Sequence, residues 1–105
     1  MPKYKNVITV NEDGRFDSLA ELFRWQQLKL MQEAGEIQDL KRQVPYPFTV
    51  KNPEGEDVQV FKYIADHVYR QEGGTIVEDV KGHRTKEFII KRKCIQAQYG
   101  IGILS

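Results

Sequence analysis

A β-hairpin pattern in the second half of the chain constrains the fold more than any other feature. Residues 63–69 and 75–81 flank the glycine pair Gly73-Gly74, which is typical of a tight turn between antiparallel strands. Successive side chains point to opposite faces of a strand, so a single residue pair fixes the register of the whole hairpin. We expect Tyr69 to pair with Ile76.

This register brings acidic residues together. It sets Asp66 opposite Asp79 and places Lys81 on the same face. Two neighbouring carboxylates repel one another, and oxygen ligands of this kind suit a divalent cation, so the pattern predicts a metal site. The ammonium group could position or deprotonate a water, as in enzymes that cleave phosphodiester bonds. A purely structural alternative is an ion pair between Asp66 and Lys81, with Asp79 in solvent.

Alternation also distinguishes the two adjacent acids of the second strand. Asp79 shares a face with Lys81, whereas Glu78 shares the other face with Val80. The pattern therefore favours Asp79 as the ligand. A bulge at the glycine pair would invert this parity and turn Glu78 inward.

A further acid begins the first predicted helix, which we expect over residues 19–34 with Gly35 as its stop signal. Ser18 and Glu21 have the spacing of a capping box, which would give the glutamate a structural role only. Against this, Glu21 recurs with Trp25 and Leu28 at i, i+4 and i+7, on an apolar stripe. Carboxylates are rarely buried without a partner, so a functional role stays open beside the capping role.

The spacing of Asp66 and then Asp79-x-Lys81, with Glu21 on a preceding helix, resembles the PD-(D/E)xK nuclease superfamily. Five separate blocks also resemble an uncharacterised family of small bacteriophage proteins thought to be related to Holliday junction resolvases: residues 16–21, 34–40, 63–66, 78–82 and 99–101. Two positions depart from the superfamily pattern. Ala65 replaces a proline, and Asp79 replaces the commoner glutamate.

The resemblance implies a fold and an activity. The fold is a single α/β domain over residues 1–105, a restriction-endonuclease-like core with a central mixed sheet flanked by helices, in the order β-α-β-β-β-β-α-β. The activity is that of a DNA endonuclease that uses Mg²⁺, which Mn²⁺ can replace, on branched or recombination-intermediate DNA. Asp66, Asp79, the Val80 carbonyl and Glu21 would hold the metal, and Lys81 would position the water. The alternative is a catalytically silent DNA-binding or assembly protein that keeps the fold.

Charge is distributed unevenly along the chain. Residues 81–105 contain six lysines and arginines but only one acidic residue, although the net charge of the whole chain is +1. Such a segment is suited to bind the DNA backbone, and we expect phosphate contacts from Arg84, Lys86, Lys91 and Lys93. The alternative is a solvated helix face.

Composition sets the remaining expectations. The single cysteine excludes an internal disulfide, and the histidines have no zinc-ligand spacing. Neither a signal segment nor a long apolar stretch is evident, so we expect a cytoplasmic protein without a membrane span, in the bacterial host cytoplasm if the protein is phage-encoded. A second apolar stripe on the last predicted helix could pack on the first helix or on a second subunit, and with so short a chain we expect a homodimer.

The other predicted elements follow from turn and helix signals. Pro45 and Pro47 are expected to interrupt an extended segment. In the first half of the chain we expect a strand at 6–10 ended by a turn at 11–14, extended segments at 37–44 and 48–50, and a turn at 52–55. In the second half we expect a strand at 58–69, a helix at 86–98 ended by Gly100, and a strand at 101–104.

Overall fold

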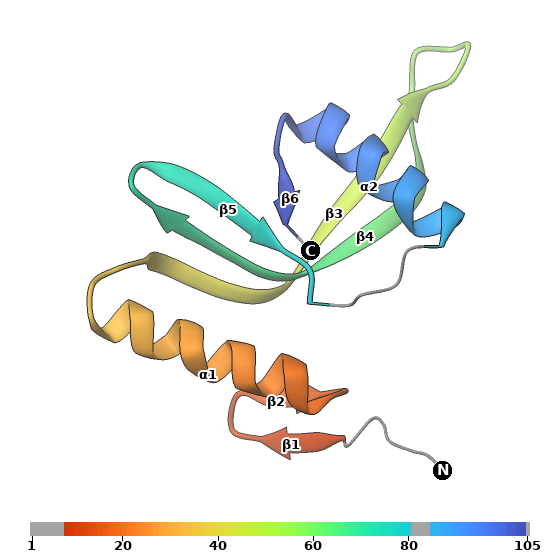
Figure 1. The fold of residues 1–105 in the computed structure, drawn as a ribbon. Helices are drawn as coiled ribbons and strands as arrows, with labels where there is room; N and C mark the ends of the chain where they lie inside the picture. Colours follow the sequence, from red (N-terminus) through yellow and green to blue (C-terminus); the bar gives the residue numbers. More distant parts are fainter. Residues whose placement is uncertain (1–7, 81–84, 105) are drawn as a thin grey trace.

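The computed structural model describes residues 8–80 and 85–104, which form a mixed β-sheet with two helices and a separate hairpin (Figure 1). The elements in chain order are β1 (Thr9–Asn11), β2 (Gly14–Phe16), α1 (Leu19–Glu33), β3 (Gln38–Lys51), β4 (Asp57–Gln71), β5 (Gly74–Glu78), α2 (Lys86–Tyr99) and β6 (Ile103–Leu104). The main sheet has the order β3-β4-β5-β6, with β6 parallel to β5 and the other pairs antiparallel. The predicted α/β class with a mixed sheet is confirmed.

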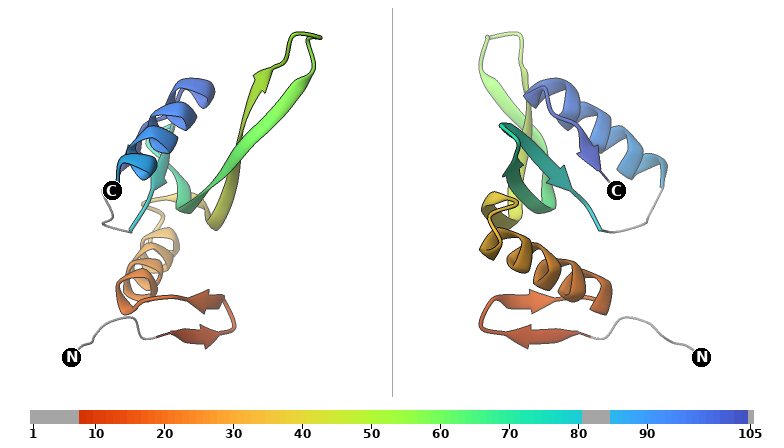
Figure 2. Two further views of the ribbon diagram at one scale, coloured as in Figure 1. Left: turned by 90° about the vertical axis from the view of Figure 1, so that its right-hand side faces the viewer. Right: turned by 60° about the vertical axis from the view of Figure 1, so that its left-hand side comes forward.

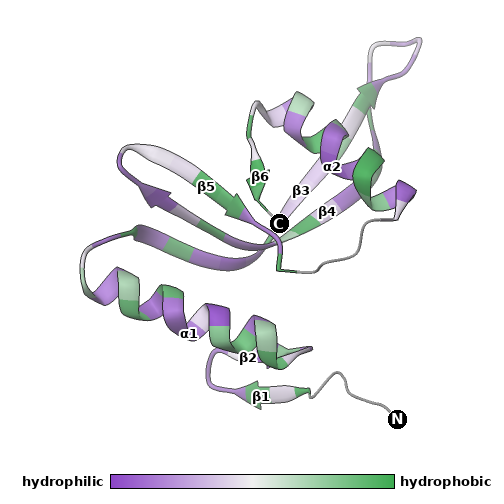
Figure 3. Cartoon of the chain, in the orientation of Figure 1, coloured by the Kyte–Doolittle hydropathy of each residue, from purple (hydrophilic) through white to green (hydrophobic). Residues whose placement is uncertain are grey.

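The two helices pack against opposite faces of this sheet, as the turned views in Figure 2 help to follow. Neighbouring residues of β5 demonstrate the arrangement, because Ile76 packs with Leu28 of α1 whereas Val77 packs with Ile95 of α2. Consecutive strand residues point to opposite faces, so α1 and α2 must lie on different sides. In Figure 3 the apolar colouring is strong at the end of β5 and along β6, where the α2 side of the core lies.

The predicted cap at Ser18 and the predicted stops at Gly35 and Gly100 are confirmed. The Ser18 hydroxyl accepts a hydrogen bond from the Glu21 amide at 3.2 Å, and Gly35 follows α1 with a φ of 81°. Thr85 caps α2 in the same way, and Gly100 ends it in the left-handed conformation. The predicted boundaries at 19–34 and 86–98 each differ from the structure by one residue at the C-terminal end.

The predicted register of the acidic hairpin is confirmed, because Tyr69 pairs with Ile76. The turn itself lies one residue earlier than the glycine pair suggests. Gln71 pairs with Gly74, which leaves Glu72 and Gly73 as the two turn residues, with φ values of 51° and 80°. Two central residues with positive φ form the type I′ turn that matches the twist of a hairpin.

One prediction about the strands is wrong, and another is incomplete. Pro45 and Pro47 do not interrupt the chain, because β3 is one continuous strand from Gln38 to Lys51. A proline removes a backbone donor, but β3 lies at the edge of the sheet, where one side of the strand needs no ladder bonds. The strand predicted at 6–10 overlaps β1, which pairs with a second strand, β2, that was not predicted. Residues 6 and 7 of that prediction lie outside the described part. The order is therefore β-β-α-β-β-β-α-β.

An ion pair fixes α1 on the sheet. Arg24 of α1 donates to both carboxylate oxygens of Glu78 at the end of β5, at 2.9 and 2.5 Å, and the Tyr69 hydroxyl donates to the same carboxylate. Burial opposes ionisation of Glu78, but the hydrogen bonds from Arg24 and Tyr69 outweigh it and hold the pKa of that carboxyl far below its usual range. Burial and the contact with Glu78 raise the pKa of Tyr69 to about 12.

Glu78→Gln should lower the free energy of unfolding at neutral pH by about 1.5–3 kcal/mol, because hydrogen bonds to a buried charge are lost. The pKa of Glu78 is lower in the folded than in the unfolded chain, so its stabilising contribution is complete above about pH 4.5 and is lost as the pH falls below that value. Urea unfolding at several pH values between about 3 and 7 should therefore show a weaker pH dependence for the variant.

Glu54→Gln, in the exposed turn between β3 and β4, is the matched control and should follow the wild-type curve. If the Glu78→Gln curve ran parallel to that of wild type over the acidic range, the assigned pKa shift would be wrong.

Candidate functional site

Besides Glu78, three buried acidic residues lie near the junction of α1, β4 and the end of β5. Glu21 is 6% exposed, Asp66 is 3% exposed and Asp79 is 6% exposed. A buried carboxylate is costly unless it is paired or hydrogen-bonded, so this arrangement needs an explanation beyond stability. These are the three acids that the sequence predicts as metal ligands.

Asp66 and Asp79 each accept a hydrogen bond from a neutral donor on a neighbouring segment of the chain. The Val80 amide donates to Asp66 Oδ2 at 2.8 Å, and the Tyr63 hydroxyl donates to Asp79 Oδ2 at 2.8 Å. The paired register ends at His67 and Glu78, where β5 ends. Beyond that point, the hydrogen bond from the Val80 amide places the Asp79–Val80 peptide next to Asp66. Burial and the contact with Asp79 raise the pKa of Tyr63, which keeps its hydroxyl a donor at neutral pH.

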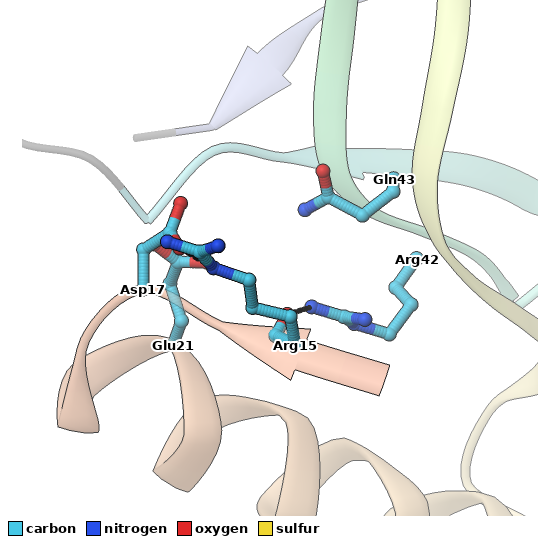
Figure 4. Close-up of a pocket in the computed structure, with 5 residues that line it drawn as sticks. All are labelled: Arg15, Asp17, Glu21, Arg42 and Gln43. Carbon is cyan, nitrogen blue, oxygen red and sulfur yellow. Dashed lines mark hydrogen bonds and ion pairs between the residues drawn. The ribbon is translucent and has the colours of Figure 1, made fainter. Parts of the chain in front are cut away.

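Glu21 has no such partner in the described part of the chain. Its main-chain amide completes the Ser18 cap, but its carboxylate makes no hydrogen bond to another described residue, so the reciprocal half of the capping box is absent there. The carboxylate lines a pocket of about 340 Å³ (Figure 4), together with Arg15, Asp17, Arg42 and Gln43. The predicted apolar stripe on α1 is confirmed, because Glu21, Trp25 and Leu28 are all buried.

Glu78 lies on the other face from Asp79, as alternation predicts. Its carboxylate is bound by Arg24 and Tyr69, while Asp79 is bound by Tyr63, which belongs to the core beneath α2. The geometry therefore gives Glu78 a structural partner on α1 and leaves Asp79 beside Asp66. No inversion of parity occurs at the turn.

The basic residues fall into three groups. Lys81 and Arg84 lie outside the described residues. Lys86 and Lys93 are exposed on α2, where they can reach a ligand in solvent. Lys91 is partly covered, because it forms an ion pair with Glu87 at 3.5 Å and lies 5.5 Å from the centre of the Phe61 ring.

Sequence reasoning missed several residues of this region. Arg42 donates to the backbone carbonyls of Asp13 and Arg15 and stacks 3.9 Å above the ring of Phe16, so it joins β3 to the β1–β2 hairpin. Gln43 donates to Asp66 across a distance of 3.4 Å. Neither residue belongs to a motif, and no periodicity marks them. Only the pairing of β3 with β4 brings them to the site.

The described residues contain no group of three or more His, Cys, Asp or Glu side chains close enough to hold a metal ion together. The donor chemistry nevertheless suits Mg²⁺, which takes oxygen ligands and usually binds through one or two carboxylates, with waters and substrate phosphates completing its shell. Asp66 and Asp79 supply such a pair. Glu21, in the adjacent pocket, could act directly or through a water.

The fold and the buried acids together define an α/β protein with a candidate acidic site at the end of its central hairpin. The chain belongs to the family described as "Protein of unknown function (DUF1064)", whose model matches residues 1–101. No curated protein and no solved structure matches the chain. Within residues 8–80 and 85–104, neither helix combines the length and apolar character needed to cross a membrane.

Glu21→Gln separates a structural from a metal-binding role. The variant keeps the Ser18 cap, which uses the main-chain amide, and it removes a buried charge, so its metal-free melting temperature should equal or exceed that of wild type. Mg²⁺ or Mn²⁺ should raise the melting temperature of wild type but raise that of the variant much less, because a weaker ligand set gives less stabilisation by mass action.

Thermal unfolding with and without each metal measures both effects. Glu33→Gln, an exposed acid at the other end of α1, serves as the control and should respond to metal like wild type. An equal metal response in Glu21→Gln would remove Glu21 from the site.

Proposed function

We propose that this protein is a Mg²⁺-dependent DNA endonuclease, with a restriction-endonuclease-like core and branched or recombination-intermediate DNA as its substrate. The observation that carries the proposal is the burial of Asp66 beside Asp79, with Glu21 in the adjacent pocket. Buried acids near one another are favourable when a cation joins them. The sequence resemblance supplies the substrate class.

In this proposal Asp66, Asp79 and the Val80 carbonyl hold the metal, and Glu21 completes the set directly or through a water. The bound Mg²⁺ would stabilise the negative charge that develops on the phosphate during cleavage. The protein's own groups orient the ligands, because the Val80 amide fixes one oxygen of Asp66 and the Tyr63 hydroxyl fixes one oxygen of Asp79.

The basic residues have two roles in the proposal. Lys81 would position the attacking water or neutralise charge near the phosphate. Arg84, Lys86, Lys91 and Lys93 would contact the DNA backbone, and Lys86 and Lys93 are exposed for this role. A homodimer would allow two strands to be cut symmetrically.

Asp79→Asn should abolish cleavage and leave the fold intact. The substitution removes a metal-binding charge at nearly constant volume, and the amide oxygen can still accept the hydrogen bond from Tyr63. The assay compares a four-way junction, a flap and a linear duplex, each with and without Mg²⁺ or Mn²⁺, and circular dichroism checks the fold of the variant.

The control is Asp57→Asn, an exposed acid at the far end of the β3–β4 hairpin, which should cleave like wild type. Full activity of Asp79→Asn together with loss of activity in a folded Glu78→Gln would transfer the metal-binding role to Glu78. Wild-type protein that binds these DNAs without cleaving any of them would favour the silent DNA-binding alternative.

Replacing Lys86, Lys91 and Lys93 with alanine should weaken DNA binding about equally across sequences. It should also flatten the dependence of log K on log salt by up to about three units, since each lost phosphate contact removes about one released counterion. The three exposed lysines of the β3–β4 hairpin, Lys41, Lys51 and Lys62, provide a matched triple variant whose salt slope should not change. Fluorescence anisotropy over a salt series measures the affinity and the salt slope of each variant. An unchanged slope in the α2 variant would show that DNA binds to another surface of the protein.

A further inference from the structure

Gln43 has a backbone conformation that the strand pairing does not require. It lies in β3 between the pairs Arg42↔His67 and Val44↔Ala65, so it is directly opposite Asp66. Its φ is 56°, in the left-handed region that residues other than glycine seldom adopt. Non-glycine residues held in this region cluster at functional sites, where the surrounding structure maintains the strain.

A second residue of β3 shows why this is unusual. Asp39 has a φ of 55°, but it lies within the register shift between Gln38 and Lys41, where an irregular backbone is expected. The register on either side of Gln43 continues without a shift. The conformation of Gln43 is thus not explained by a bulge of the β3–β4 ladder.

The side chain of Gln43 contacts one buried acid and lines the pocket of another. Its Nε2 donates to Asp66 Oδ1 at 3.4 Å, a long hydrogen bond of the kind that often tightens when substrate binds. The same side chain lines the 340 Å³ pocket that contains Glu21, and Figure 4 shows its amide directed toward that pocket. The other oxygen of Asp66 is already held by the Val80 amide, so Gln43 completes the orientation of this carboxylate.

We propose that Gln43 is a positioning residue of the acidic site, which orients Asp66 toward the pocket of Glu21 so that the two carboxylates act on one cation. An amide suits this role because it donates a hydrogen bond to the carboxylate and carries no charge of its own. The strained φ aims the side chain at Asp66 from the opposite strand. This inference rests on the proposed metal-dependent cleavage.

Gln43→Gly tests the role, because glycine relieves the backbone strain while removing the amide. The variant should keep or raise the melting temperature in the absence of metal. Mg²⁺ affinity by calorimetry, or kcat for cleavage, should fall by about tenfold to a hundredfold, which is the usual effect of losing a residue that orients a metal ligand. The KM for DNA should not change, since Gln43 is not proposed to contact the nucleic acid.

Two variants control for backbone effects. Asp39→Gly relieves the same φ strain in the same strand, and it should keep wild-type metal affinity and kcat. Gln43→Asn keeps an amide and tolerates positive φ, so it should recover part of the lost activity. Equal losses in Asp39→Gly and Gln43→Gly would show that the effect comes from the strand and would overturn the proposal.

The outcomes also separate this inference from the proposed function. If wild-type protein neither binds Mg²⁺ nor cleaves DNA, the proposed function fails, and the role of Gln43 fails with it. If wild type does both and Gln43→Gly matches it in affinity and kcat, only the role of Gln43 is overturned.

Discussion

The ion pair between Arg24 and Glu78 fixes where α1 lies on the sheet, and the candidate site depends on that position. Arg24 is bound at both nitrogens that face the carboxylate, so the contact sets the orientation of the helix as well as its distance. Glu21 precedes Arg24 by almost one helical turn and is therefore carried to a fixed place beside the strand ends. The pair also engages the carboxylate of Glu78, so the proposed metal site uses its neighbour Asp79.

Asp66 contacts both parts of the candidate site, namely Gln43 from β3 and the Asp79–Val80 segment that follows β5. One of its oxygens accepts a hydrogen bond from Gln43, which lines the pocket of Glu21, and the other is held by the Val80 amide next to Asp79. In the described chain the three acids do not form a single metal-binding group, so a cation would have to draw them together, with waters and substrate phosphates completing its shell. This is consistent with Mg²⁺ sites that are completed by the nucleic acid itself.

Local patterns predicted much of the structure because they act within a few residues. Ser18 and Gly100 mark helix ends through hydrogen bonds and backbone conformations that neighbouring residues determine. The register of the acidic hairpin follows from a short turn that leaves the strands little freedom. The error at Pro45 and Pro47 has the opposite origin, since a proline is tolerated only where a strand lies at a sheet edge, and edge position is a property of the whole sheet.

The sequence by itself determined the acidic hairpin, its register, the two capped helices and the presence of three acids in the order helix, strand, strand. These depend on side-chain alternation and short-range hydrogen bonds, which the order of residues specifies directly. Only the tertiary structure decided that Glu78 pairs with Arg24, that Glu21 is buried in a pocket, and that Gln43 faces Asp66. Such contacts join residues far apart in the chain. They form only when α1 packs on the sheet and β3 pairs with β4, which brings those residues within reach.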